Sequence, residues 1–110
     1  MEKFINYLKD NKFVLPYCTR CSAPAWPPVD FCYICMSKVK LKKTKSPEGH
    51  LIEYTISYRL SKPHVFGIIE MGGIKLIGSV HSSVAPYVGM FLRMKNCGIL
   101  NDGTPYYEFY

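Results

Sequence analysis

The sequence predicts a mainly β protein that begins with a short helix, continues through a four-cysteine metal segment and ends in five strands. Two observations indicate this order. Four cysteines lie in two Cys-x-x-Cys pairs with ten residues between the pairs, a spacing typical of a metal site. Beyond them come five apolar or alternating segments separated by Gly, Pro and Asn-Asp-Gly turns, the pattern of short strands in an all-β domain.

The first element is expected at residues 3–12. Phe4, Tyr7 and Leu8 recur there at helical spacing with charged and polar residues between them, which predicts a short amphipathic helix. A helix of this length is marginal alone in water. We therefore expect its apolar stripe to dock on the rest of the chain.

The second element is the metal segment at residues 14–36, with its ligands at Cys18, Cys21, Cys32 and Cys35. Two Cys-x-x-Cys turns brought together present four thiolates, the tetrahedral set of a structural Zn²⁺ ion, with no position left open for chemistry. Iron in the same cage or a pair of disulfides are the alternatives. No signal-peptide pattern and no membrane-length apolar run is present, so we expect a cytoplasmic protein, where disulfides are rare.

Other residues near the metal segment carry smaller expectations. A glycine often follows the second cysteine of such a knuckle, where positive φ is needed, but Ser22 and Met36 stand there and predict modest strain. Trp26 and Phe31, between the knuckles, are expected to pack over the metal. Cys97 lies far away in the sequence and is expected to be a buried small apolar residue rather than a ligand.

The remaining elements are strands expected at residues 50–60, 65–71, 74–80, 90–95 and 106–110. The first alternates strictly, with an apolar face formed by Ile52, Tyr54, Ile56, Tyr58 and Leu60. A turn is expected at residues 46–49 before it, and a Gly-Gly hairpin at residues 72–73. Three strands, a connection and two more strands are the order of the five-stranded OB-fold barrel, with a small SH3-like barrel as the alternative. This places a helix and zinc ribbon at residues 1–45 and an OB-fold domain at residues 46–110.

The charge of the chain indicates an anionic partner. The net charge is +6, and five lysines lie close together at Lys38, Lys40, Lys42, Lys43 and Lys45. Nucleic acid, the phosphates of a nucleotide-bearing cofactor and an acidic protein face each suit such a patch; a solvated strand face is the alternative.

No enzymatic motif is visible in the sequence. The three histidines, at positions 50, 64 and 81, have no partner at motif spacing, and neither a P-loop nor a nucleophile elbow is present. The residues alone therefore predict that the chain is not an enzyme.

Several motifs together resemble a known family. They are Tyr-Cys-Thr-Arg-Cys at 17–21, Pro-Pro at 27–28, Cys-Tyr-Ile-Cys at 32–35, Gly-His-Leu-Ile-Glu-Tyr-Thr at 49–55 and Glu-Met-Gly-Gly-Ile-Lys-Leu at 70–76. The chain resembles the acyl-CoA-associated family called domain of unknown function 35, whose members join an N-terminal helix and a rubredoxin-like zinc ribbon to an OB-fold. Ser22, Val29 and Tyr33 depart from the family pattern, which leaves the ribbon's outer surface, and with it the partner, open.

The resemblance implies a non-catalytic accessory or scaffold subunit beside a thiolase-like enzyme. In archaeal cases such a subunit links acetoacetyl-CoA thiolase to hydroxymethylglutaryl-CoA (HMG-CoA) synthase in the mevalonate route to isoprenoids. The ribbon and helix would dock on the enzymes, and the barrel would help to hold CoA or acyl-CoA. Lys75, Arg93 and Lys95, expected on the outward faces of their strands, would contact the CoA phosphates. A single-stranded nucleic-acid-binding OB-fold protein is the alternative.

Overall fold

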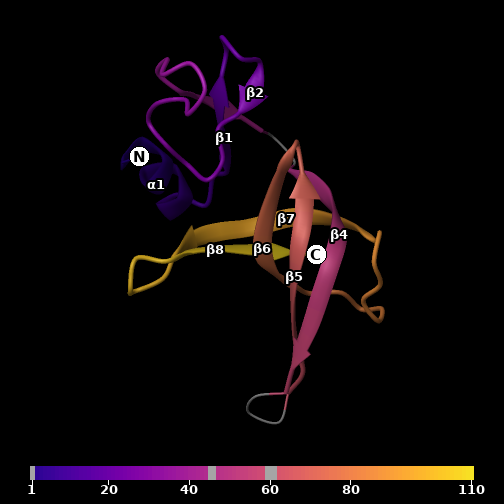
Figure 1. Ribbon diagram of the computed structural model, residues 1–110. Helices are drawn as coiled ribbons and strands as arrows, with labels where there is room; N and C mark the ends of the chain where they lie inside the picture. The colour runs from indigo at the N-terminus through magenta and orange to yellow at the C-terminus, as the bar shows by residue number, and fades with distance from the viewer. Residues whose placement is uncertain (1, 45–46, 59–61) are drawn as a thin grey trace.

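The computed structural model describes residues 2–44, 47–58 and 62–110 of the chain. Within them the elements are α1 (Glu2–Lys9), β1 (Val14–Cys18), β2 (Ala23–Pro24), β3 (Lys40–Lys43), β4 (Glu48–Ser57), β5 (His64–Met71), β6 (Ile74–Val80), β7 (Phe91–Ile99) and β8 (Pro105–Phe109). The first three strands form a small sheet in the order β2-β1-β3, and the other five close a barrel in the order β4-β5-β6-β8-β7 (Figure 1). The predicted fold class is confirmed.

The helix forms where the apolar spacing predicts it, but it is shorter than expected. Its last turn ends before Asn11, which has a positive φ of 58° and donates its backbone N–H to the Leu8 carbonyl. Phe4 and Leu8 are fully buried in the main core, so the apolar stripe docks on the chain as expected. Among the described residues, no helix is long and apolar enough to cross a membrane.

The metal segment contains more regular structure than its sequence indicates. β1 pairs antiparallel with β2 and with β3, although the segment at residues 14–36 shows no strand periodicity. The reason is length: β2 has two residues and β3 has four, too few for a periodic signal. In Figure 1 this small sheet and α1 lie together at one end of the molecule, beside β7 and β8.

The barrel has the strand order of an OB-fold. β4, β5 and β6 form an antiparallel meander, and β8 closes the barrel by pairing parallel with β6 and antiparallel with β7. Gly72 and Gly73 make the predicted hairpin with φ values of 58° and 87°, a left-handed pair that other residues rarely adopt. β7 also extends to Ile99, beyond the expected end at residue 95.

β4 departs from the strict alternation read in its sequence. Its register against β5 shifts between Leu51 and Glu53, so one extra residue forms a bulge at Ile52. The bulge brings Leu51, Tyr54 and Ile56 to the barrel-facing side, opposite Ile69, Gly67 and Val65. Only Leu51 is buried there, whereas Tyr54 and Ile56 are each 38% exposed.

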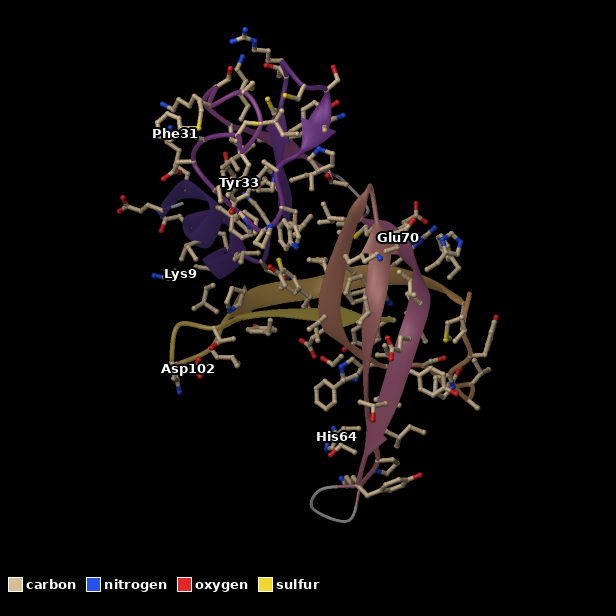
Figure 2. All side chains as sticks on the ribbon, viewed as in Figure 1. Lys9, Phe31, Tyr33, His64, Glu70 and Asp102 are labelled. Atoms are coloured by element: carbon tan, nitrogen blue, oxygen red, sulfur yellow. The ribbon has the colours of Figure 1, made fainter. Side chains whose placement is uncertain are left out.

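This exposure has a topological cause. β4 pairs with β7 only at Glu48–His50, so the rest of β4 has a partner strand on one side alone. The far ends of β4 and β5 project away from the ribbon, and His64 lies near the tip of this arm (Figure 2). The expected alternating face of Ile52, Tyr54, Ile56, Tyr58 and Leu60 is therefore interrupted at Ile52, and its described members are all exposed; residues 59 and 60 lie outside the described residues.

The turn expected at residues 46–49 is also wrong in its second half, because β4 already includes Glu48 and Gly49. Residue 46 lies outside the described residues. The strand begins early because Glu48 and Gly49 pair with Arg93 and Leu92 of β7, which no local turn signal reveals.

One core joins the helix and ribbon to the barrel. Trp26 packs against the rings of Phe4, Phe13 and Tyr107, with centroids 5.8, 6.2 and 6.5 Å from its own. The expectation that Trp26 covers the metal is therefore wrong: it fills the junction between ribbon and barrel. The division into residues 1–45 and 46–110 stays a prediction, and this shared aromatic cluster is what binds its two parts.

Candidate metal centre and neighbouring surfaces

Each cysteine pair lies on a tight turn of the ribbon. Cys18 ends β1 and stands opposite Ala23 of β2, so the first pair occupies the turn between these strands. At the second pair, Cys32 donates its N–H to the Ser37 carbonyl at 2.9 Å and accepts from the Met36 N–H at 3.0 Å through its own carbonyl. These backbone bonds fold the two turns into opposing knuckles.

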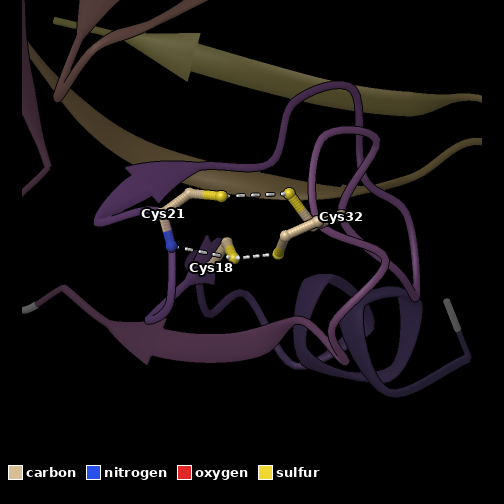
Figure 3. Close-up of side chains that lie close together, drawn as sticks. Cys18, Cys21 and Cys32 are labelled. Atoms are coloured by element: carbon tan, nitrogen blue, oxygen red, sulfur yellow. Dashed lines mark hydrogen bonds between the residues drawn. The ribbon is translucent and has the colours of Figure 1, made fainter.

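The knuckles bring all four sulfurs together (Figure 3). The Sγ atoms of Cys18, Cys21, Cys32 and Cys35 lie within 4.8 Å of one another. Cys18 Sγ is 3.5 Å from Cys35 Sγ, and Cys21 Sγ is 3.8 Å from Cys32 Sγ. Four sulfurs bound tetrahedrally at the Zn–S distance of 2.3 Å would be about 3.8 Å apart. The cluster therefore has the donors and the size of a four-thiolate metal site, and all five cysteines are free of disulfides.

Hydrogen bonds prepare this cluster for a cation. The backbone N–H groups of Cys21 and Ile34 point at the sulfurs of Cys18 and Cys32, each at 3.4 Å. Hydrogen bonds from the Ser37 hydroxyl and backbone N–H lower the pKa of Cys35 to about 6. The pKa of Cys21 is raised to about 12, and the largest cause is its side-chain hydrogen bond with Cys35. Negative charge thus accumulates on part of the cluster, which favours a bound metal.

Cys97 lies outside this cluster, as expected. It is buried in the main core, and burial raises its pKa to about 11, so it remains a neutral thiol near neutral pH. Its backbone N–H donates to Asn11 Oδ1 at 2.8 Å. Cys97 is therefore a packing residue of β7.

The residue after each second cysteine has the strained backbone that the sequence indicated. Ser22 has φ 52° and Met36 has φ 61°, in the left-handed region that disfavours residues with a Cβ atom. These two positions turn the chain back after each knuckle.

Replacing either residue by glycine is expected to stabilise the protein. Ser22→Gly and Met36→Gly should each raise the free energy of unfolding by about 0.5 kcal/mol, since relief of left-handed strain outweighs the added chain entropy of glycine. Thermal unfolding of the metal-loaded chain measures the change. Ser57→Gly, in β4, is the control and should lower stability; a loss of stability in Ser22→Gly would contradict the strain.

The second knuckle carries an exposed apolar surface. Phe31, Tyr33, Ile34 and Met36, hereafter the knuckle patch, are all exposed, with Tyr33 at 70% and Ile34 at 82%. Figure 2 shows Phe31 at the outer side of the ribbon. The expectation that Phe31 packs over the metal is therefore wrong. Four exposed apolar side chains within residues 31–36 make this turn a candidate interaction surface.

The three residues expected to contact CoA phosphates do not converge on one point. Lys75 stands opposite Glu70 across β5 and β6, while Arg93 Nε forms an ion pair with Glu48 Oε2 at 3.2 Å. In the closed barrel β6 and β7 are separated by β8 on one side and by β5 and β4 on the other, so Lys75 lies on a strand that does not pair with β7. Arg93 and Lys95 share the outward side of β7, where Lys95 Nζ lies 5.2 Å from the Tyr110 ring centre.

One group of polar residues was missed in the sequence. His81 Nε2 lies 3.2 Å from Glu108 Oε2, and its ring stacks on Tyr110 at 4.8 Å. His64 and His81 also line one cavity of about 380 Å³. The parallel pairing of β6 with β8 brings these residues together. The OB-fold strand order was the one available signal, because nothing in the local sequence connects His81 with Glu108.

Comparison with known proteins identifies the fold. No family model and no curated protein matches the chain. Two solved structures share its fold over nearly its whole length. One, described as "Ltp2-ChsH2(DUF35) aldolase", has a TM-score of 0.73 and 18% sequence identity, covering 97% of this chain and 91% of that one. The other, a protein of unknown function from the DUF35 family of Sulfolobus solfataricus, has a TM-score of 0.62 and 24% identity, covering 99% and 84%.

These structures confirm the resemblance at the level of fold and correct one prediction. Both carry the name of the family that the motifs resemble. The prediction that the chain is no enzyme, but a non-catalytic subunit, is contradicted, because a chain of this fold belongs to an aldolase. The prediction rested on the absence of local enzymatic motifs and on the family resemblance, and neither reveals groups that come together from distant strands or from two proteins.

Proposed function

We propose that this chain is the zinc-containing component of an acyl-CoA-processing enzyme assembly. Its ribbon docks on a thiolase-fold enzyme subunit, and its barrel helps to hold the acyl-CoA. The pair of partners that fits the sequence resemblance is acetoacetyl-CoA thiolase and HMG-CoA synthase, held together in the cytoplasm by this chain. One solved structure supports an assembly of this kind. It contains a chain of the same fold, and it is described as an aldolase named for two components, Ltp2 and ChsH2.

The knuckle patch is the observation that carries the proposal. Its four apolar side chains project from a turn held by backbone hydrogen bonds and by the cysteine cluster. A protein surface gains by covering such a patch, at roughly 25 cal/mol for each Å² of apolar area removed from water. Because the turn is already rigid, little conformational entropy is lost on docking.

Exposed apolar side chains of β4 support the acyl-CoA part of the proposal. Tyr54 and Ile56 are on the barrel-facing side of the strand but stay exposed, because β7 does not pair with this part of β4, and apolar side chains of this kind can receive a thin carbon chain. Arg93 and Lys95 lie on the outward side of β7 and Lys75 on β6, and their positive charges would attract the CoA phosphates. Lys75 lies on a strand that does not pair with β7, so we expect it to contact a phosphate separately from the other two.

Zinc is the metal that the four-sulfur cluster fits best. The set contains sulfur ligands only, and a closed tetrahedral set of thiolates is typical of structural zinc. Bound there, the ion would fix both knuckles and thereby the knuckle patch. Iron suits the same four ligands, so direct metal analysis decides between them.

Docking through the knuckle patch can be tested by changing its most exposed members. The double variant Tyr33→Ser, Ile34→Ser is expected to weaken binding to a coexpressed thiolase-fold enzyme by at least about tenfold, because two exposed apolar anchors are lost. Pull-down and calorimetry with the purified pair measure the effect. Ile77→Ser is the matched control, since Ile77 is also exposed, at 73%, but lies on β6 of the barrel.

Two outcomes would contradict the docking proposal. One is unchanged binding in the double variant; the other is equal weakening in Ile77→Ser, which would indicate nonspecific association. Tight oligonucleotide binding that falls steeply with added salt would favour the single-stranded nucleic-acid reading instead.

A further inference from the structure

A cavity of about 370 Å³ lies at the junction of ribbon and barrel, apart from the cysteine cluster and the knuckle patch. Its walls come from the segment after α1, from the end of β3 and from β7. A volume of this order lies within the range of small-molecule sites. The junction therefore offers space that packing of the two parts leaves open.

Three lysines from separate elements line this cavity. Lys12 follows α1, Lys43 ends β3 and Lys95 lies in β7. Among the described residues that line the cavity no acidic residue occurs, and none of the three lysines forms an ion pair within the described part of the chain. Like charges gathered around one concave site repel each other unless an anion lies between them.

The backbone around the cavity holds two of these lysines in place. Asn11, with its positive φ, accepts from the Cys97 N–H at 2.8 Å and donates to Asn96 Oδ1 at 3.3 Å. This side chain ties the end of α1, and with it Lys12, to β7. The register of β7 against β8 shifts between Met94 and Asn96, so Lys95 occupies a β-bulge, a feature that redirects a side chain and is common beside binding sites.

The deeper wall of the cavity is apolar. Phe13, Val14 and Met94 line it and belong to the buried core. A ligand that matches the whole cavity therefore combines an anionic group with an apolar or flat organic part.

We propose that this junction cavity binds a phosphorylated small molecule of nucleotide size, with its phosphate among Lys12, Lys43 and Lys95. Lysine ammonium groups bind phosphate as point charges, and the apolar wall receives the organic part. The site is separate from the knuckle patch, so it stands or falls independently of enzyme docking. Lys95 alone is shared with the residues proposed for CoA phosphates.

Calorimetric titration of the full, metal-loaded chain with AMP at low ionic strength tests the site. We expect saturable binding that weakens at least about tenfold in the triple variant Lys12→Gln, Lys43→Gln, Lys95→Gln, since three favourable charges are lost. Lys62→Gln is the control, because Lys62 is an exposed lysine outside the cavity, and AMP binding to this variant should change less than about twofold. Adenosine, which has no phosphate, should bind far more weakly than AMP.

Further probes identify the source of the phosphate. If CoA binds more tightly than AMP, and if the triple variant loses affinity for both to the same extent, the cavity is assigned to the nucleotide end of CoA. Equal binding would assign it to a free nucleotide, and either result supports the site. Absence of saturable binding by both probes, or an equal loss in Lys62→Gln, would overturn the proposal, even where the chain still binds its enzyme partner. Circular dichroism and metal content show that the triple variant remains folded.

Discussion

Replacing Cys32 by serine is expected to abolish stoichiometric metal binding and to unfold the ribbon. Cys32 is buried, lies 3.8 Å from Cys21 Sγ and receives the Ile34 N–H at its sulfur. Structural zinc contributes on the order of 10 kcal/mol of apparent binding energy to folding, which is comparable with the whole stability of a domain, about 5–15 kcal/mol. Losing one thiolate of four therefore removes most of what holds the segment at residues 14–36.

The measurements are metal content by mass spectrometry and thermal unfolding followed by circular dichroism. Cys97→Ala is the matched control: it removes a buried cysteine thiol that lies outside the cluster and should keep one metal ion per chain, with a loss of stability of about 1 kcal/mol. Excess chelator should reproduce the Cys32→Ser result in the unaltered protein. A Cys32→Ser variant that keeps its metal and its melting temperature would contradict the four-thiolate site. Iron rather than zinc in the purified protein would correct only the identity of the metal.

The parts of the fold that depend on local sequence could be predicted. The two knuckles follow from the spacing of their cysteines, and the β5–β6 hairpin follows from Gly72 and Gly73, whose positive φ other residues rarely adopt. The helix follows from the spacing of Phe4 and Leu8. Each of these signals lies within a few residues, where steric and packing preferences act directly.

The parts that depend on contacts between distant segments could not be predicted. The bulge at Ile52 exists because β4 must meet both β5 and β7, and one extra residue changes which side chains face the barrel. Tyr54 is exposed because β7 pairs with only the first residues of β4, and the local sequence of β4 does not reveal where this pairing ends. Trp26 is drawn to the junction core by Phe4 and Tyr107, which lie at opposite ends of the chain.

The candidate sites show the same distinction. The cysteine cluster was predicted with all four members, whereas the lysines around the junction cavity were not recognised as a group. Lys12, Lys43 and Lys95 come from three separate segments of the chain, and only the docking of the ribbon on the barrel brings them around one cavity. The contact of His81 with Glu108 was missed for a related reason, since these two residues meet only in the closed barrel.

Replacing Phe4 by alanine is expected to give the second large effect, a loss of about 3–5 kcal/mol in the free energy of unfolding. Phe4 is 1% exposed, and its ring meets Phe13 and Trp26 edge to face at centroid distances of 6.2 and 5.8 Å. Truncation leaves a cavity where the helix, the ribbon and the barrel meet. Phe31→Ala is the control: Phe31 is 56% exposed, so its loss should change stability by less than about 0.5 kcal/mol.

The shape of the unfolding transition adds a second readout to Phe4→Ala. Because Phe4 packs in the same core as Tyr107 and Phe109 of β8, we expect residues 1–45 and 46–110 to unfold together, with tryptophan fluorescence and far-ultraviolet circular dichroism giving one midpoint. Trp26 reports on the junction and the circular dichroism on the barrel strands. If the fluorescence midpoint falls while the barrel signal keeps its original midpoint, the two parts are independent domains and the shared core contributes little. A common shift of both signals would show that the helix stabilises the barrel as well as the ribbon.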